Sequence, residues 1–106
     1  MSVMLVYITA GDVEEAREIG SELLMRNLAA CVNIIEKMES MYWWEGKLEH
    51  SAEAVLLAKT TPELVETLVG TVKNIHSYDC PAILAFESRQ GNEDFFEWVN
   101  SHTKSL

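Results

Sequence analysis

The chain has 106 residues, of which 48% are hydrophobic and 24% charged, and it contains only 5 Gly and 2 Pro. This size and composition predict a single globular domain covering residues 1–106, and they exclude a multidomain enzyme with a separate cofactor domain. Eight Lys and Arg residues against 17 Asp and Glu give a formal net charge of −9, so we expect neither nucleic acid nor an anionic membrane surface as a partner.

The cysteines and the apolar segments bear on the cellular compartment. Cys31 and Cys80 are too few for a disulfide framework and do not form a C-x-x-C pair. Residues 1–9 are apolar but lack the basic flank and the cleavage site of a signal peptide, and no apolar run reaches the length of about 18 residues that spans a bilayer. We therefore expect a cytoplasmic protein with reduced thiols. Cys31 lies in the apolar stretch LAACVNII and is predicted to be a core residue rather than a nucleophile.

The first predicted elements are a strand and a helix. Val3–Ala10 is short and continuously apolar, which is typical of a strand covered on both faces. Gly11 ends this strand, and Asp12 can cap a helix that runs to Arg26. The apolar residues of this helix recur at helical spacing: Ala16, Ile19, Leu23 and Leu24.

The rest of the chain predicts a hairpin, a second helix, a fourth strand and a last helix. Residues 30–59 are rich in Val, Ile, Tyr and Trp and are interrupted at Glu45-Gly46, which predicts two long strands joined by a turn. Pro62 is suited to the first position of a helix that runs to about residue 74. Residues 82–88 predict the fourth strand, and Asn92 can cap the last helix.

The predicted order is that of a ferredoxin-like βαββαβ sandwich of the α+β class, with a long hairpin and an extra C-terminal helix. Right-handed crossovers would place both main helices on one face of a four-stranded sheet. Residues 3–8 are apolar at both alternating sets of positions, so the opposite face of the sheet is apolar too. Adjacent Trp43 and Trp44 must also face opposite sides of the hairpin, and one short chain has no second layer to cover both. We therefore expect a homo-oligomer in which hairpin arms reach neighbouring subunits.

The hairpin carries aromatic and acidic side chains. Tyr42, Trp43 and Trp44 are predicted to lie at a subunit interface, with stacking on a planar ligand as the alternative. A loose acidic series is predicted to be a solvated strand face, with a low-affinity cation surface as the alternative. Its members are Glu36, Glu39, Glu45, Glu49 and Glu53.

The densest set of reactive groups is the segment HSYDCP at residues 76–81. The chain has no G-x-G-x-x-G, Walker A, H-E-x-x-H or C-x-x-C motif, so we expect a protein that is not an enzyme. Imidazole and thiolate suit copper or zinc, which makes His76, Asp79 and Cys80 the candidate metal ligands. The alternative is that His76 or Tyr78 holds this loop in place through hydrogen bonds.

The hairpin sequence YWWEGKLE at residues 42–49 resembles the CutA family of divalent-ion tolerance proteins. The resemblance continues in TAGDVEEAREIGSELLMRNLAACVNI, in KTTPELVETL, and in the motif H-x-Y-x-x-P formed by His76, Tyr78 and Pro81. These segments cover nearly the whole chain in the order found in the family. The resemblance implies a ferredoxin-like subunit of a very stable homotrimer, a cytoplasmic location in microbes, and an architecture similar to the nitrogen-regulatory PII signalling proteins.

The resemblance also implies a role in divalent-cation tolerance and the binding of copper or another divalent cation. Some relatives bind metal through a Cys at the end of the first strand, the His of the H-x-Y-x-x-P motif and a Glu directly after its Pro. These positions are Ile8, His76 and Ala82 in this chain, so only the His is present. A metal site of this kind would need Cys80, Asp79 or groups from another subunit.

Three hypotheses for the function follow. The first is a non-enzymatic homotrimer that binds a divalent metal and acts in ion tolerance or signalling. The second is a PII-like trimer that binds a small ligand or a protein, with His76 and Tyr78 lining a cleft between subunits. The third is an enzyme that uses His76 as a general base near Tyr78.

Overall fold

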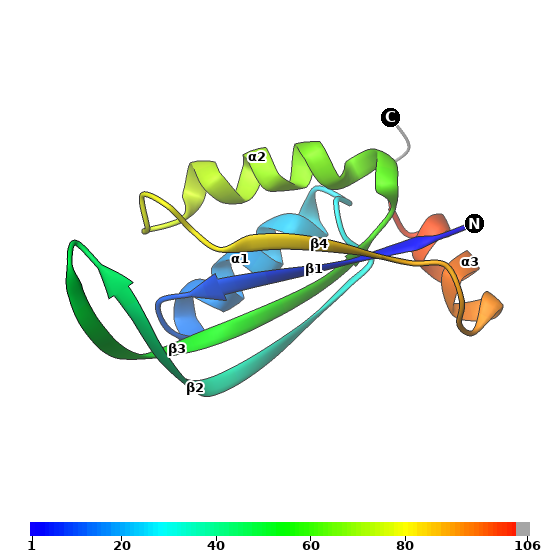
Figure 1. The fold of residues 1–106 in the computed structure, drawn as a ribbon. Coiled ribbons are helices and arrows are strands. Elements are labelled where there is room, and N and C mark those ends of the chain that lie inside the picture. The colour runs from blue at the N-terminus through cyan, green and yellow to red at the C-terminus, as the bar shows by residue number, and fades with distance from the viewer. Residues whose placement is uncertain (104–106) are drawn as a thin grey trace.

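The computed structural model describes residues 1–103 of the chain (Figure 1). Its four strands are β1 (Val3–Ala10), β2 (Cys31–Trp44), β3 (Lys47–Thr60) and β4 (Ile83–Ser88). The α-helices in the same range are α1 (Val13–Met25), α2 (Val65–Ile75) and α3 (Glu93–Ser101), and a short 3-10 turn (Pro62–Leu64) precedes α2. This order confirms the predicted α+β arrangement, including the long hairpin and the extra last helix.

Side-chain caps begin two of the helices at the predicted residues. Asp12 Oδ1 accepts a hydrogen bond from the backbone N–H of Glu15 at 2.8 Å, and Asn92 Oδ1 accepts one from that of Asp94 at 3.0 Å. Each cap satisfies a backbone N–H that has no partner inside the helix. The second helix differs slightly from the prediction, because the turn that starts at Pro62 is a 3-10 helix and the α-helix begins at Val65.

The strands form one antiparallel sheet in the order β2-β3-β1-β4. Helices α1 and α2 cover the same face of this sheet, as predicted (Figure 1). The main core lies between that face and the two helices, and its larger members include Val6, Ile8, Leu56, Ile19, Leu23, Leu64, Leu68 and Val72. Because side chains alternate along a strand, Leu5 and Tyr7 of β1 point to the opposite, open face.

Apolar side chains on the open face are exposed in the single chain. Leu84 and Phe86 of β4 pair with Tyr7 and Leu5 of β1 and therefore share their face. Leu84 is 52% exposed and Phe86 is 56% exposed. The expectation of a sheet with apolar side chains on both faces is confirmed.

Cys31 lies on the open face and is only half-buried. It pairs with Lys59, whereas the next residue of β2, Val32, packs against the core. The prediction that Cys31 is a core residue is therefore wrong, because the alternation of β2 directs its side chain away from the helices. A continuously apolar stretch does not by itself reveal which of its alternating positions faces the core.

The hairpin of β2 and β3 has the predicted turn and also a bulge. Glu45 and Gly46 have φ angles of 50° and 79°, which suit a two-residue hairpin turn. Between Ile35 and Met38 the register shifts by one residue, and Lys37 has a φ of 61°. A bulge of this kind bends a strand. Beyond it the hairpin curves upward toward the segment that connects α2 to β4 (Figure 1).

The register beyond the bulge assigns the hairpin side chains to two faces. Met38, Tyr42 and Trp44 occupy alternate positions and share one face, whereas Met41 and Trp43 occupy the other. Trp44 is 53% exposed and Trp43 is 74% exposed. The prediction that the two Trp residues face opposite sides is confirmed.

Candidate functional site

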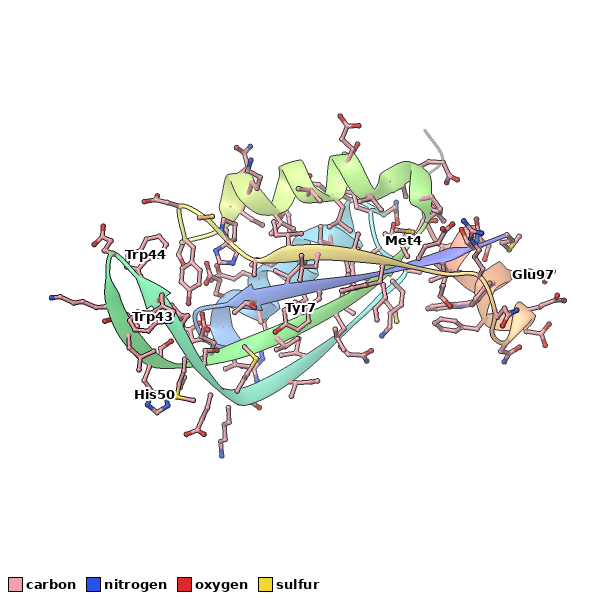
Figure 2. The ribbon with its side chains drawn as sticks, viewed as in Figure 1. Met4, Tyr7, Trp43, Trp44, His50 and Glu97 are labelled. Atoms are coloured by element: carbon pink, nitrogen blue, oxygen red, sulfur yellow. The ribbon has the colours of Figure 1, made fainter. Side chains whose placement is uncertain are left out.

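A cavity of about 710 Å³ lies on the open side of the sheet, between the bent half of the hairpin and residues 76–82. We call it the hairpin cleft. Figure 2 shows Tyr7 pointing from β1 to the side opposite the helices, and Trp44 near the tip of the hairpin. The residues that line the cleft are Tyr7, Thr9, Met38, Glu39, Ser40, Met41, Tyr42, Trp44, Glu49, Glu53, Tyr78, Asp79, Cys80 and Ala82.

His76 holds the loop of residues 76–82 against the end of β1. Its Nε2 lies 2.7 Å from the carbonyl oxygen of Thr9, and its Nδ1 lies 3.0 Å from the backbone N of Tyr78. A carbonyl oxygen can only accept and a backbone N–H can only donate, so Nε2 carries the proton and Nδ1 is the acceptor. The side chain has no exposed surface. In this conformation neither ring nitrogen has a free lone pair for a metal ion or a substrate proton.

Glu15, at the start of α1, binds the other side of the same loop. Its Oε1 accepts hydrogen bonds from the backbone N–H of Gly11 at 2.8 Å and from Ser77 Oγ at 3.0 Å, and its Oε2 accepts one from the backbone N–H of Ser77 at 2.7 Å. Burial raises the pKa of Glu15, but these hydrogen bonds outweigh it and hold the pKa below its usual value. A Cβ at Gly11 would lie 3.2 Å from Glu15 Oε1 and 3.4 Å from the hydroxyl of Tyr78, so glycine makes this close approach possible.

Tyr78 and Glu53 form a hydrogen-bonded pair at the wall of the cleft. The hydroxyl of Tyr78 donates to Glu53 Oε2 at 2.6 Å. Burial, followed by this hydrogen bond and the negative charge of Glu53, raises the pKa of Tyr78 well above its usual value, so the phenol remains a donor at neutral pH. Glu53 is only 8% exposed, and its Oε1 forms no hydrogen bond within the described part of the chain. No buried side-chain oxygen within residues 1–103 lacks a partner, so Oε1 of this mostly buried residue is open to solvent.

The lining of the hairpin cleft is acidic, aromatic and sulfur-containing. Its carboxylates are Glu39, Glu49, Glu53 and Asp79, and among the residues that line it there is no Lys or Arg. Its aromatic residues are Tyr7, Tyr42, Trp44 and Tyr78, and its sulfur-containing residues are Met38, Met41 and Cys80. This lining attracts cations and repels phosphate groups.

The structure separates the predicted metal ligands. Asp79 and Cys80 line the cleft, whereas His76 lies behind it with a fully buried side chain. Across residues 1–103, no group of three or more His, Cys, Asp and Glu side chains is arranged to hold a metal ion. The metal site at His76, Asp79 and Cys80 remains a prediction, and the residues fit such a site only if other groups join Asp79 and Cys80.

Three of the four predicted interface residues line the hairpin cleft. Tyr42, Trp44 and Tyr78 line the hairpin cleft, and Trp43 does not. The alternative in which His76 holds the loop through hydrogen bonds matches the observed contacts.

Sequence analysis missed two acidic residues of this site. Glu53 belongs to the acidic series that we interpreted as a solvated strand face. This interpretation is wrong for Glu53, because the residue is only 8% exposed. Its position directly before the apolar run Ala54–Ala58 was a usable signal, since a carboxylate at the edge of such a run requires a partner. Glu15 is an acidic residue in the first turn of α1, and nothing nearby in the sequence indicates its contact with Ser77, 62 residues away.

Comparison with known proteins identifies the family. The sequence profile of the CutA1 divalent ion tolerance proteins matches residues 4–102, which run from β1 to the end of α3. The chain belongs to the CutA1 family. The resemblance inferred from the hairpin and loop motifs is confirmed.

Individual CutA relatives match along nearly the whole chain. The Oryza sativa protein named Protein CutA 1, chloroplastic, is 38% identical over 101 residues, which are 95% of this chain and 57% of that protein. The Archaeoglobus fulgidus divalent-cation tolerance protein CutA is 41% identical over 95 residues, 90% of this chain and 92% of that protein. The crystal structure of CutA1 from Oryza sativa superposes with a TM-score of 0.96 at 36% identity, covering 100% of this chain and 97% of that one. The chain therefore spans somewhat over half of the longer plant protein and nearly all of the archaeal one.

Within residues 1–103, no helix of this CutA1-family chain is long and apolar enough to cross a bilayer.

Proposed function

We propose that this chain is a ferredoxin-like protomer of a cytoplasmic homotrimer that acts in divalent-cation tolerance as a non-enzymatic, PII-like sensor. In this proposal the trimer senses its signal by binding a small ligand in the hairpin cleft. The observation that carries the proposal is the cleft itself, a cavity of about 710 Å³ lined by aromatic rings, polar groups and one buried carboxylate. Small-molecule sites have this size and this mixed lining.

Exposed apolar side chains on the hairpin support the homotrimer. Trp43 is 74% exposed and Leu48 is 62% exposed, and the two residues pair across the hairpin on the face that points away from the cleft. A continuous apolar surface of this kind is unfavourable in water and is typical of a surface that another protein covers. Copies of the same chain are the simplest partner, because closed homo-oligomers are the commonest assemblies.

A divalent metal site, copper being the first candidate, is the second function that a specific observation favours. Asp79 and Cys80 line the same cavity as Glu53, so a carboxylate and a soft sulfur ligand are available on one side of it. The remaining ligands would have to come from a rearranged loop or from another subunit. His76 is not among the available ligands in this conformation, because both of its ring nitrogens are hydrogen-bonded.

The bonding of His76 also supports a function without catalysis. A general base needs a nitrogen lone pair within reach of the substrate proton. Nδ1 of His76 already accepts from the backbone of Tyr78, and Nε2 donates to Thr9. A screen for product formation by the wild type and by His76→Ala should show no activity that depends on His76.

A thermal-shift screen and a calorimetric titration test the proposed function. A thermal-shift screen of common metabolites should find a ligand that stabilises the wild type and not Trp44→Ala, because a ligand of the folded state raises apparent stability. Trp98→Ala is the matched control. Trp98 lies on α3 outside the cleft, so the ligand should still stabilise this variant. Calorimetric titration of the metal-free protein with Cu²⁺ should show only weak binding. A stoichiometric Cu²⁺ site that is lost in Cys80→Ser, with no metabolite stabilising the protein, would contradict the proposal and support the metal site.

A further inference from the structure

We propose that the ligand of the hairpin cleft is an organic cation, an amine or guanidinium compound, which Glu53 binds while the aromatic rings of the cleft pack against its carbon atoms. This inference rests on the proposed function, because it names the chemical class of the ligand for the same site.

The first argument is the charge of the cleft. Four residues with carboxylates line it, and no Lys or Arg within residues 1–103 does. The Arg residues that form ion pairs in the described chain do so elsewhere, with Glu14, Glu22 and Glu87. Within residues 1–103, only Glu39 among the four lies close to a basic side chain, with His50 Nε2 at 3.7 Å on the exposed side of the hairpin. A phosphate or carboxylate ligand would therefore meet uncompensated negative charge, whereas a cation would be attracted.

The second argument is Glu53. It is 8% exposed, it lines the cavity, and its only hydrogen bond in the described chain comes from the hydroxyl of Tyr78 to Oε2. The residue as a whole is mostly buried, but its second oxygen is open to solvent in the cleft. Oε1 remains available to accept from an N–H of a ligand, and a charge-assisted hydrogen bond of that kind is stronger than a neutral one.

The third argument is the aromatic lining. Tyr7, Tyr42, Trp44 and Tyr78 present ring surfaces to the same cavity. An ammonium or guanidinium group within about 6 Å of such a ring is attracted to its face. The combination of a buried carboxylate with several rings suits a cation that also has apolar surface, and it offers little to a small hydrated ion.

The size of the cavity separates an organic cation from a metal ion. A metal ion requires several donor atoms that converge at about 2.0–2.6 Å, and no such group of three His, Cys, Asp or Glu side chains occurs among residues 1–103. The carboxylates of the cleft instead surround a cavity of about 710 Å³. A compound with N–H groups separated by a carbon chain can reach more than one carboxylate without requiring them to converge.

Calorimetric titration of the purified full chain tests the inference. Agmatine and spermidine are the organic cations, and ATP is the anionic comparison. We expect saturable binding of at least one of the two amines, weakened about tenfold or more by Glu53→Gln because the variant loses a charge-assisted hydrogen bond. Glu49→Gln, at a more exposed position of the same cleft, should weaken binding about threefold. Glu36→Gln, the same charge change on the hairpin outside the cleft, should leave the affinity within about twofold.

Each other outcome overturns the inference in a distinguishable way. Saturable ATP binding that is lost in Trp44→Ala would leave the proposed ligand cleft in place and reject a cationic ligand. Amine binding that is unaffected by both Glu53→Gln and Glu49→Gln would assign it to the general acidic surface. Loss of the oligomer in Glu53→Gln, with no amine bound by the wild type, would assign the cleft to a neighbouring copy of the chain. No ligand bound in the cleft at all would reject the proposed function as well.

Discussion

Three side chains connect the loop of residues 76–82 to separate parts of the fold. His76 joins it to the end of β1 through Thr9, Glu15 joins it to α1 through Ser77, and Tyr78 joins it to β3 through Glu53. All are direct hydrogen bonds of 2.6–2.7 Å. These contacts place Asp79 and Cys80 at the rim of the hairpin cleft.

At the scale of single residues, His76→Ala should destabilise the protein. The change leaves the carbonyl of Thr9 and the backbone N–H of Tyr78 without partners, and it creates a cavity where a fully buried ring was. We expect a loss of about 2–4 kcal/mol in the free energy of unfolding. Urea denaturation at fixed protein concentration measures it, with His50→Ala, at an exposed ring, as the control that should change stability by less than about 0.5 kcal/mol. Equal stability of the two variants would contradict the structural role of His76.

Glu15 should make the stability depend on pH in a defined direction. Its pKa in the folded protein lies below the ordinary value of 4.5, so the ionised form stabilises the fold. This stabilisation is fully present above pH 4.5 and is lost as the pH falls through the folded value below it. The wild type should therefore be more stable than Glu15→Gln at neutral pH, and the difference should shrink below pH 4.5.

Thermal unfolding of the wild type and Glu15→Gln between about pH 3 and pH 7 measures this effect. Glu18→Gln is the matched control, because Glu18 lies on the exposed side of the same helix and forms no hydrogen bond with the loop. A difference between the wild type and Glu15→Gln that stays constant across this range would show that the charge of Glu15 does not stabilise the fold.

At the scale of elements, the bulge in β2 decides the composition of the cleft. Strict alternation from Ile35, which lies on the open face, would continue that face through Met41 and Trp43. The extra residue at the bulge instead brings Met38, Tyr42 and Trp44 to it. One inserted residue therefore exchanges the two Trp side chains between the cleft and the outer face.

The backbone of Lys37 offers a test of the bulge. Its φ of 61° lies in the left-handed region, which glycine adopts freely and β-branched residues avoid. Lys37→Val should be less stable than Lys37→Gly by about 1–2 kcal/mol, measured by thermal or urea unfolding. The same pair of changes at Lys47, in β3, should show the opposite order, because valine is favoured and glycine disfavoured in a regular strand. The same order at both positions would argue against the bulge.

At the scale of the whole molecule, the apolar outer face of the hairpin predicts assembly. We expect light scattering to give a mass three times that of the 12.0 kDa chain. Trp43→Ser combined with Leu48→Ser should shift the mass toward that of one chain, because these exposed side chains form the apolar surface that a neighbouring copy would cover. Trp98→Ser on α3 is the control and should leave the mass unchanged. A wild type that stays monomeric at all concentrations would contradict the homotrimer.

The sequence by itself determined the order and the approximate bounds of the elements and the family. A continuous apolar run specifies β1, Asp12 and Asn92 specify two helix starts, and Glu45-Gly46 specifies the turn. These features depend on residues within a few positions of one another, so local patterns reveal them.

Only the tertiary structure decided which side chains meet at the site. Ser77 and Glu15 are 62 residues apart in the chain, and Tyr78 and Glu53 are 25 apart, so no local pattern predicts their hydrogen bonds. The bulge at Lys37 likewise selects Trp44 over Trp43 for the cleft, because one extra residue reverses the alternation of every later side chain in the strand. Long-range contacts and strand register are set by the packing of the whole sheet, and the hairpin cleft is made of both.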